Sequence, residues 1–465
     1  MITPEEINLM CIAHQTNQAL SRTADHIIES TKILTAEDNK ELFIYHEGYY
    51  QKNSNAIIEP IIKNLWQDKL KRNYINEIIQ AHIIPQTYIP REQLNNNIEY
   101  TNLKNGVLNL TTGLLEPHNP NYNFTFQLPV NYKPEATCPK IETFLKQVCK
   151  EETDIETIYE LISYCLYRSY PLAKVFVLLG GGRNGKSTLI EVIKAFLGAD
   201  NIRNMSMHQL EHDTYSKGYL FGKHANMNPD VGNKKLITSG AIKSLTGGDM
   251  IDSNVKHKDY MRFKNFAKLI FASNELPSSD DTSYAWMSRW IFLKFPHNFD
   301  GEKCQECHQI HPMDKNLLSK LTTEEELSGL LNKVIPALLR LKNNGWNFTL
   351  SSYVKNMEKE YARLSDPVKA FIEDFIEEDE YEKVSKTDVY NAYSNYVYDL
   401  GDKPIMSNAF TQKLKQYIPS LKDTRTGNTK YWLGLKLREK HLQSDLNNVD
   451  NPGGGLSPSA WKEQE

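Results

Sequence analysis

The amino-acid sequence predicts a multi-domain α/β protein whose central part is built on a parallel β-sheet. Three observations lead to this fold class. The chain has 465 residues, which is too long for a single hydrophobic core. Between residues 173 and 300, short apolar runs alternate with helical segments and glycine-rich turns, as in parallel sheets with crossover helices. The flanking regions carry different mixtures of helical and strand-like periodicity, which indicates further domains.

The composition excludes several classes of protein. Hydrophobic residues make up 40% and charged residues 24%, and no apolar run approaches the roughly 20 residues that span a bilayer. The first residues lack the basic start and apolar block of a secretory signal, and six cysteines are too few for a disulfide framework. We therefore expect a cytoplasmic location, reduced thiols and no membrane partner. Because the net charge is -4, any contact with DNA must come from local basic clusters.

The region before the central domain divides into two parts. Residues 1–134 combine a helical pattern at 57–70 with alternating runs at 42–50 and 106–110, so we expect a small α+β domain. Helical periodicity then dominates residues 135–172, which we interpret as a helical lead-in to the central domain.

The central domain is expected to span residues 173–300. Its segments 175–179 and 268–272 are short, apolar and rich in residues that favour strands, which is typical of buried central strands. We expect residues 301–366 to form a helical extension.

The clearest motif is Gly-Gly-Gly-Arg-Asn-Gly-Lys-Ser at residues 180–187, which has the spacing of a nucleotide-binding P-loop. An apolar strand precedes it and an amphipathic helix follows, so a glycine-rich turn without a nucleotide is the weaker interpretation. Loop N–H groups would surround a triphosphate, Lys186 would contact its outer phosphates and Ser187 would ligate Mg²⁺. We expect ATP and Mg²⁺ as cofactors. The predicted nucleotide-binding residues are Gly180, Gly181, Gly182, Arg183, Asn184, Gly185, Lys186, Ser187 and Thr188.

Three later residues complete the predicted catalytic set with Lys186. Asp230 would hold Mg²⁺ or polarise the attacking water, although the polar residues before it leave open a solvated turn. Asn274 follows an apolar run, at the sheet edge where ligands bind, and would orient that water unless it merely starts the turn before Pro277. Arg289 would act as an arginine finger on a neighbouring subunit's nucleotide, or it is an ordinary surface arginine.

Residues 367–436 carry the signals of three helices followed by two strands. Ser385 and Ser407 are suited to cap the second and third helices, and residues 426–428 separate the strands. This order is typical of a winged helix-turn-helix, which serves either as a protein-interaction module or as a DNA reader. We favour duplex DNA because basic residues lie on the third helix and the wing. They are Lys413, Lys415, Lys422, Arg425 and Lys430. Residues 437–465 are predicted to be a disordered tail.

Four segments together identify a resemblance. They are Asn-Gly-Val-Leu-Asn-Leu at 105–110, Gly-Arg-Asn-Gly-Lys-Ser at 182–187, Ile-Lys-Ser-Leu-Thr-Gly-Gly-Asp at 242–249 and Ala-Ser-Asn-Glu-Leu-Pro at 272–277. In this order they resemble the superfamily 3 helicases of the phage and plasmid primase–helicase family, which includes the poxvirus primase-helicase. The resemblance covers approximately residues 103–435.

The resemblance implies an AAA+ fold, homo-hexameric rings, ATP sites between subunits and unwinding usually in the 3′-to-5′ direction. It also implies a hairpin between Asp249 and Asn274 whose tip enters the channel of the ring. The residues expected at this tip are Lys256, His257 and Lys258, with Arg262 and Lys264 on the returning arm. Cations at the tip suit sequence-independent contact with a phosphate backbone, although an ordinary basic turn stays open.

The sequence departs from the family in two respects. Related motors often place two adjacent carboxylates where this chain has only Asp230, so the catalytic base is open and Glu275 is a weak candidate. The region before residue 103 lacks the metal-binding acids and histidine of a primase, so we expect a helicase without primase activity and a separate primase as a candidate partner. Cys304, Cys307, His308 and His311 have the spacing of half a zinc site, but a reduced surface loop is favoured.

The predicted function is that of an ATP-dependent hexameric DNA helicase, acting on single-stranded and duplex DNA in the replication of a phage, plasmid or other mobile element. Two alternatives stay open. One is a replication initiator that binds origin DNA and uses ATP as a switch without unwinding. The other is an ATPase that remodels proteins.

Overall fold

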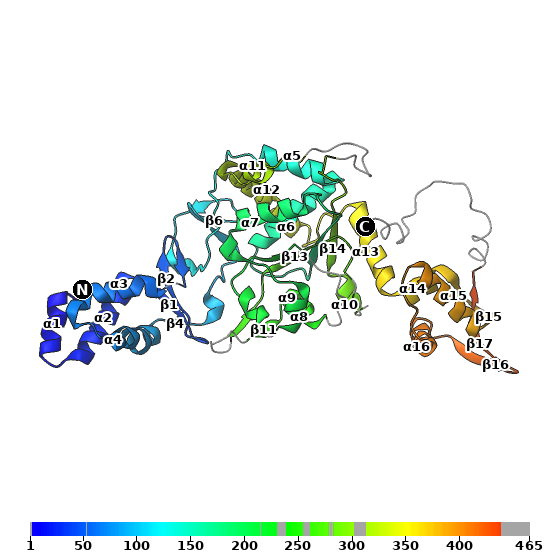
Figure 1. Cartoon of the computed structure of the whole chain (residues 1–465), viewed down its shortest axis with the longest axis horizontal. Helices are drawn as coiled ribbons and strands as arrows, with labels where there is room; N and C mark the ends of the chain where they lie inside the picture. Colours follow the sequence, from blue (N-terminus) through cyan, green and yellow to red (C-terminus); the bar gives the residue numbers. More distant parts are fainter. Residues whose placement is uncertain are drawn as a thin grey trace. The chain divides into compact units, whose positions relative to one another are not determined.

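The computed structural model describes residues 2–438 except 53, 214, 230–238, 254–260, 278, 280, 282 and 302–312. The chain forms two compact units, Met1–Glu358 and Lys359–Glu465 (Figure 1). The first unit contains the predicted parallel sheet, so the expected multi-domain α/β class is confirmed. None of its described helices is long and apolar enough to cross a membrane, and the same holds for the described helices of the second unit.

The central sheet has five parallel strands in the order β14-β8-β13-β10-β9. The strand that precedes the glycine-rich loop, β8, therefore lies inside the sheet between β13 and β14. Figure 1 shows α6 and α7 on one face of this sheet and α8 and α9 on the other. The strands are β8 (Val175–Leu179), β9 (Ile202–Arg203), β10 (Ala225–Asn228), β13 (Lys268–Ser273) and β14 (Trp290–Lys294).

Strand β10 was not expected, because its sequence is polar. Its residue Asn226 is fully buried, and its amide bonds both backbone groups of Met205: Oδ1 accepts from the Met205 nitrogen at 2.9 Å, and Nδ2 donates to the Met205 oxygen at 2.8 Å. An amide side chain whose hydrogen bonds are all made costs little free energy inside a sheet. A strand that alternates asparagine with apolar residues can therefore be buried. Asp230 lies outside the described residues, but it follows β10 by two positions.

The lead-in and the extension form one helical layer on the first unit. The helices α5 and α12 meet where the Glu326 carboxylate accepts hydrogen bonds from the nitrogens of Lys140 (3.2 Å) and Ile141 (3.0 Å). This carboxylate satisfies N–H groups that the start of α5 leaves unpaired. The helices on and beside the central sheet are α5 (Pro139–Val148), α6 (Glu152–Leu166), α7 (Lys186–Leu197), α8 (Met207–His212), α9 (Gly240–Gly247), α10 (Tyr284–Met287), α11 (Leu317–Leu321) and α12 (Glu324–Asn343).

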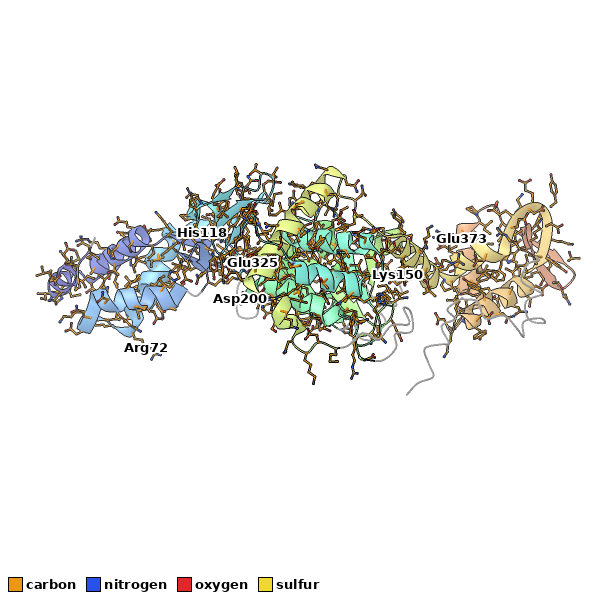
Figure 2. All side chains as sticks on the ribbon, turned by 90° about the horizontal axis from the view of Figure 1, so that it is seen from above. Arg72, His118, Lys150, Asp200, Glu325 and Glu373 are labelled. Atoms are coloured by element: carbon orange, nitrogen blue, oxygen red, sulfur yellow. The ribbon has the colours of Figure 1, made fainter. Side chains whose placement is uncertain are left out.

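The N-terminal region is α+β, as predicted. Its first sheet has the order β3-β2-β1-β4 and its second β5-β6-β7. The region is tied to α12 by Lys133, whose ammonium contacts Glu324 at 2.7 Å and Glu325, labelled in Figure 2, at 3.7 Å. The elements are α1 (Pro4–Ile12), α2 (Thr16–Ser30), β1 (Ile33–Ala36), β2 (Leu42–His46), β3 (Tyr49–Gln51), α3 (Ser54–Trp66), α4 (Arg72–Glu77), β4 (Tyr88–Ile89), β5 (Tyr100–Leu103), β6 (Gly106–Asn109) and β7 (Leu115–Glu116).

The second unit begins at Lys359, within α13 (Ser352–Ser365). It has the three predicted helices and an antiparallel sheet in the order β15-β17-β16. The aromatic rings of Phe371, Tyr393, Phe410 and Trp432 fill its core. The elements are α14 (Pro367–Phe375), β15 (Ile376–Ser385), α15 (Lys386–Asp399), α16 (Ser407–Tyr417), β16 (Lys422–Thr426) and β17 (Thr429–Leu437).

Two details of the second unit differ from the sequence prediction. Strand β15 was not predicted, because half of its residues are acidic and its sequence shows no apolar alternation. Ser385 caps α15 through the Thr387 nitrogen at 3.2 Å, as expected, whereas Ser407 is already the first residue of α16 and Met406 occupies the cap position. The predicted disordered tail lies outside the described residues from position 439 onward.

Candidate nucleotide-binding site

The loop between β8 and α7 depends on two glycines in unusual conformations. Gly180 and Gly185 have φ angles of +155° and +91°. A Cβ on Gly180 would lie 2.5 Å from the Phe295 oxygen, and one on Gly185 would lie 2.6 Å from Val148 Cγ1. At Gly181 and Gly182 a Cβ would meet nothing within 4 Å. The loop is therefore tightly packed at its two ends and open on its outer side.

Lys186 lies at the start of α7 and folds back beneath this loop. Its ammonium donates to the Gly181 oxygen at 2.9 Å, to Asn184 Oδ1 at 3.0 Å and to the Gly180 oxygen. Only 7% of the residue is exposed, and this burial lowers the pKa of Lys186 to about 8. A cation that contacts only neutral oxygen atoms gains more electrostatic stabilisation from an added anion than a cation that already has a carboxylate partner.

Asn274 lies beside Lys186. It follows β13, whose carboxyl end is next to that of β8, and its Oδ1 is 3.5 Å from the Lys186 ammonium. The structure therefore brings together two of the four predicted catalytic residues at the carboxyl edge of the sheet, where open α/β sheets bind ligands.

Asn184 has a role that the sequence did not distinguish. Its side chain is 2% exposed, and its Nδ2 donates to the Phe295 oxygen at 3.2 Å while its Oδ1 receives Lys186. It points into the protein and positions the loop against the end of β14. The Phe299 nitrogen adds a hydrogen bond of 2.8 Å to the Arg183 oxygen.

Arg289 lies at the other end of the sheet from this loop. It directly precedes β14, and its oxygen accepts from the nitrogen of Val175, the first residue of β8, at 2.7 Å. The two strands are parallel and rise about 16 Å over five residues, so Arg289 is remote from Lys186 of its own chain. Its Nε donates to Thr246 of α9 at 3.0 Å, and burial lowers the pKa of Arg289.

The predicted hairpin is present as the antiparallel pair β11 (Met250–Ser253) and β12 (Met261–Lys264). The tip residues Lys256, His257 and Lys258 lie outside the described residues. On the returning arm, Arg262 and Lys264 are exposed and alternate with buried Met261 and Phe263. The Phe263 ring packs against Phe221, with 5.5 Å between the ring centroids.

The predicted DNA-binding cations of the second unit differ in their partners. Lys413 pairs with Asp366 at 3.3 Å, and Lys415 pairs with Asp423 at 2.6 Å. Lys386, which was not predicted from the sequence, also contacts Asp423 and lies 3.7 Å from the centre of the Trp432 ring. The hairpin β16–β17 carries the remaining exposed cations Lys422, Arg425 and Lys430, with Arg425 Nε donating to the Gly427 oxygen at 2.9 Å.

The described residues contain no group of three or more His, Cys, Asp and Glu side chains arranged to hold a metal ion. The candidate zinc residues Cys304, Cys307, His308 and His311 are outside that part of the chain. Cys138, Cys149 and Cys165 are buried thiols, as expected of reduced cysteines.

Three family models match successive parts of the chain. "D5 N terminal like" matches residues 12–150, "Family of unknown function (DUF5906)" matches residues 178–289, and "Poxvirus D5 protein-like" matches residues 363–447.

Two viral proteins are among the relatives. A candidate helicase, L207/L206 of Acanthamoeba polyphaga mimivirus, is 28% identical over 292 residues, which are 58% of this chain and 28% of that protein. A candidate primase, C962R of African swine fever virus, is 22% identical over 338 residues, which are 68% of this chain and 34% of that protein. The chain therefore matches well under half the length of either relative.

Among solved structures, the apo A form of the NrS-1 C-terminal region superimposes with a TM-score of 0.53 and 11% identity, covering 90% of this chain and 98% of that one. A second structure, of NrS-1 residues 305–718, gives a TM-score of 0.50 at 12% identity, over 90% of this chain and 99% of that one. These likenesses concern the fold. The family matches confirm the predicted resemblance: D5-type family models match the segments before and after the central sheet in the sequence, and the chain is homologous to viral proteins described as a helicase and a primase.

Proposed function

We propose that this chain is an ATP-driven DNA helicase of the superfamily 3 type, with an AAA+ fold in its central sheet and a ring of six subunits as its working form. The observation that carries the proposal is the meeting of Lys186 and Asn274 at the carboxyl ends of adjacent strands, beneath a glycine loop that is open outward. Backbone N–H groups, a helix N-terminus and a partly desolvated cation together fit a triphosphate. The relatives' names, helicase and primase, agree with a role in viral or plasmid DNA replication.

The residues present also fit Mg²⁺. Ser187 is exposed in the first turn of α7, and Asp230 comes two positions after β10 in the sequence. A hydroxyl from the loop helix and a carboxylate after another parallel strand are the usual protein ligands of Mg²⁺ in phosphate-loop enzymes, where the ion neutralises charge on the outer phosphates. Lys186 would bind these phosphates, and Asn274 would orient the attacking water.

The experiment that tests this function measures ATP hydrolysis with and without single-stranded DNA, and strand displacement on a forked duplex. We expect stimulation by the single strand and displacement of the annealed strand. ATP and duplex binding without displacement would favour the replication initiator. Hydrolysis that single-stranded DNA fails to stimulate would favour the protein-remodelling ATPase.

The affinity for ATP is expected to fall as the pH rises above about 8. Lys186 has a pKa of about 8 when it is buried beneath the loop, whereas phosphate contact favours its charged form. Below that pH the ammonium is already charged, and above it each binding event must take up a proton, which weakens binding by about tenfold per pH unit. Fluorescent-nucleotide titrations between pH 6.5 and 9.5 measure this slope. In Lys186→Arg the guanidinium stays charged, so an equal slope in that variant would exclude Lys186 as its source.

We further propose that the hairpin β11–β12 contacts single-stranded DNA in the ring channel. Lys256→Gln with Lys258→Gln should leave basal ATP hydrolysis intact while stimulation by single strands and fork unwinding disappear, because the cations that couple nucleotide state to the DNA backbone are removed. The matched control is Lys140→Gln with Lys146→Gln, two exposed lysines on α5. Full unwinding by the hairpin variant would contradict this assignment.

The second unit is proposed to be a winged helix that binds duplex DNA through α16 and the wing β16–β17. Three helices packed against a three-stranded antiparallel sheet support this, as does the cluster of exposed cations on the wing. Exposed ion pairs such as Lys415 with Asp423 stabilise little, so phosphates can compete for those lysines as well.

Replacing Lys422, Arg425 and Lys430 with glutamine should weaken duplex binding and reduce the slope of log affinity against log salt by about 0.9 for each phosphate that the variant no longer neutralises. Unwinding of a fork with a preformed single-stranded tail should continue. Salt-dependent anisotropy titrations measure the slope, with Lys369→Gln on α14 as the control. A complete loss of fork unwinding in the folded wing variant would place this unit in the motor instead.

A further inference from the structure

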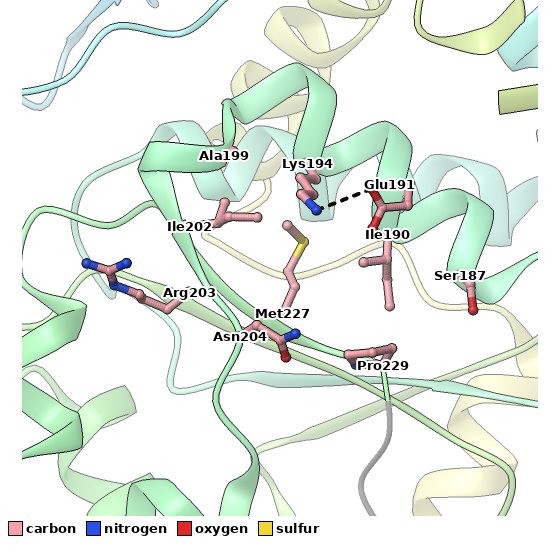
Figure 3. Close-up of a pocket in the computed structure, with 10 residues that line it drawn as sticks. All are labelled: Ser187, Ile190, Glu191, Lys194, Ala199, Ile202, Arg203, Asn204, Met227 and Pro229. Atoms are coloured by element: carbon pink, nitrogen blue, oxygen red, sulfur yellow. Dashed lines mark ion pairs between the residues drawn. The ribbon is translucent and has the colours of Figure 1, made fainter. Parts of the chain in front are cut away.

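A cavity of about 300 Å³ lies beside the phosphate loop, between α7, the segment around β9 and the end of β10 (Figure 3). Ser187, a predicted Mg²⁺ ligand, and Pro229, the last described residue after β10, both line it. Ile202 and Met227 contribute apolar surface, and Arg203 contributes an exposed guanidinium. The cavity thus combines apolar walls with a charged rim, next to the catalytic edge.

An exposed aromatic side chain lies at the opposite edge of the same sheet. Tyr284, the first residue of α10, is 87% exposed, whereas Trp286 and Trp290, which precede and follow Arg289, are fully buried. Helix α10 leads directly into β14, which is one edge strand of the sheet, and the cavity adjoins β9, which is the other. Four strand spacings of about 4.8 Å separate the two edges by about 19 Å.

Helix α10, which carries Tyr284, is held in place by hydrogen bonds and an adjacent ion pair. Ser283 caps α10 through the Trp286 nitrogen at 3.3 Å, and Lys243 of α9 donates to the Ser283 hydroxyl at 3.0 Å and forms an ion pair with Asp281. An aromatic ring on a fixed backbone loses little conformational freedom when it docks, which favours its use in an interface.

We propose that Tyr284 of one subunit inserts into this cavity of the next subunit. The inference rests on the proposed ring, in which Arg289 acts on the adjoining subunit's triphosphate. Tyr284 and Arg289 are five residues apart at the β14 edge, while the cavity and the phosphate loop share Ser187. A contact that brings Arg289 to a neighbour's triphosphate therefore brings Tyr284 to the neighbour's cavity. Such a head-to-tail contact uses two different patches and closes into a ring.

The chemistry of the two surfaces is complementary. A tyrosine ring is apolar on its faces and polar at its tip, which matches walls formed by Ile202 and Met227 and a rim that includes Asn204. The Arg203 guanidinium on the rim lies 5.9 Å from the centre of the Tyr219 ring and its Nε donates to the Tyr219 oxygen at 3.1 Å, which holds this cation beside the cavity. The docked tyrosine would then set the distance between Arg289 and the triphosphate, so the cavity is a positioning element of the subunit interface.

The test places a photoactivatable benzophenone amino acid at position 284 and irradiates rings assembled with ATP, Mg²⁺ and single-stranded DNA. We expect cross-links between chains that map to residues 187–204 or 227–229. The same amino acid at Tyr381, which is 90% exposed on β15, serves as the control and should not label these segments. Cross-links from position 284 that map elsewhere, or none in rings of confirmed size, would overturn the proposal.

A second measurement uses Tyr284→Ala and Tyr284→Phe. Because the side chain is exposed, both variants should fold and bind nucleotide as single chains. Tyr284→Ala should need at least about tenfold more protein for ring assembly, as expected when an interface no longer buries an aromatic ring. Tyr284→Phe, which keeps the ring, should assemble at close to the wild-type protein concentration. Unchanged assembly by Tyr284→Ala would overturn the docking alone, whereas failure of the wild-type chain to assemble would overturn the ring together with it.

Discussion

Lys186→Ala is expected to reduce ATP hydrolysis by about a hundredfold to a thousandfold, which is the usual cost of removing one preorganised charge from a transferred phosphate. The structure gives the reason for so large an effect. The ammonium is held beneath the loop by the Gly181 oxygen and Asn184 Oδ1, so it is in place before the nucleotide arrives. Steady-state phosphate release, measured on protein with unchanged circular dichroism, gives the rate.

The fold should survive this change, because burying the lysine is itself unfavourable, as its lowered pKa shows. Alanine removes that cost along with the hydrogen bonds, and it suits the start of α7. Lys146→Ala on α5, which removes an exposed lysine, is the control and should hydrolyse ATP at the wild-type rate. Wild-type turnover by folded Lys186→Ala would exclude the loop from the mechanism.

The apolar strands of the central sheet were predictable because their burial leaves a direct trace in the sequence. Strand β8 matches the predicted bounds, and β13 extends the predicted run by one residue. The order of these strands was not predictable, since it depends on the paths of the crossover helices. That order decides the chemistry, because it brings the residue after β13 beside the loop after β8.

Polar residues in buried positions limited the prediction. Strand β10 was not predictable because Asn226 finds its partners on Met205, far away in the chain. Lys268, the first residue of β13, is fully buried, with its ammonium donating to the oxygens of Tyr167 (2.9 Å) and Ser169 (2.7 Å). Such long-range hydrogen bonds offset the free-energy cost of burying polar groups, and no local pattern in the sequence indicates them.

The candidate site was predictable as residue types and spacing, but its geometry was not. The P-loop motif indicated Lys186, and an apolar run indicated Asn274. Their separation of 3.5 Å depends on the parallel register of β8 with β13. The inward role of Asn184 could not be distinguished from a phosphate contact, because its partner, Phe295, comes from the far end of the domain.

Arg289→Ala is expected to leave nucleotide binding nearly intact and to reduce hydrolysis by about a thousandfold or more, as loss of an arginine finger does. Because β8 and β14 are parallel, Arg289 and the phosphate loop lie at opposite ends of the strands, so direct contact of Arg289 with a triphosphate would be with that of another subunit. Nucleotide titration and phosphate release on the same sample separate binding from turnover. The control is Arg72→Ala on α4, an exposed arginine in the N-terminal region.

Mixing two inactive variants tests whether the arginine acts between subunits. When Arg289→Ala and Lys186→Ala chains assemble together, some interfaces pair an intact loop from the first with an intact finger from the second, so hydrolysis should recover in part. The recovered rate should peak near equal proportions and vanish in either pure sample. If the arginine acted within its own chain, every subunit would lack one of the two groups and the mixture would stay inactive. Absence of recovery in rings shown by native mass spectrometry to contain both chains would therefore contradict the assignment of Arg289 to a neighbouring subunit's site.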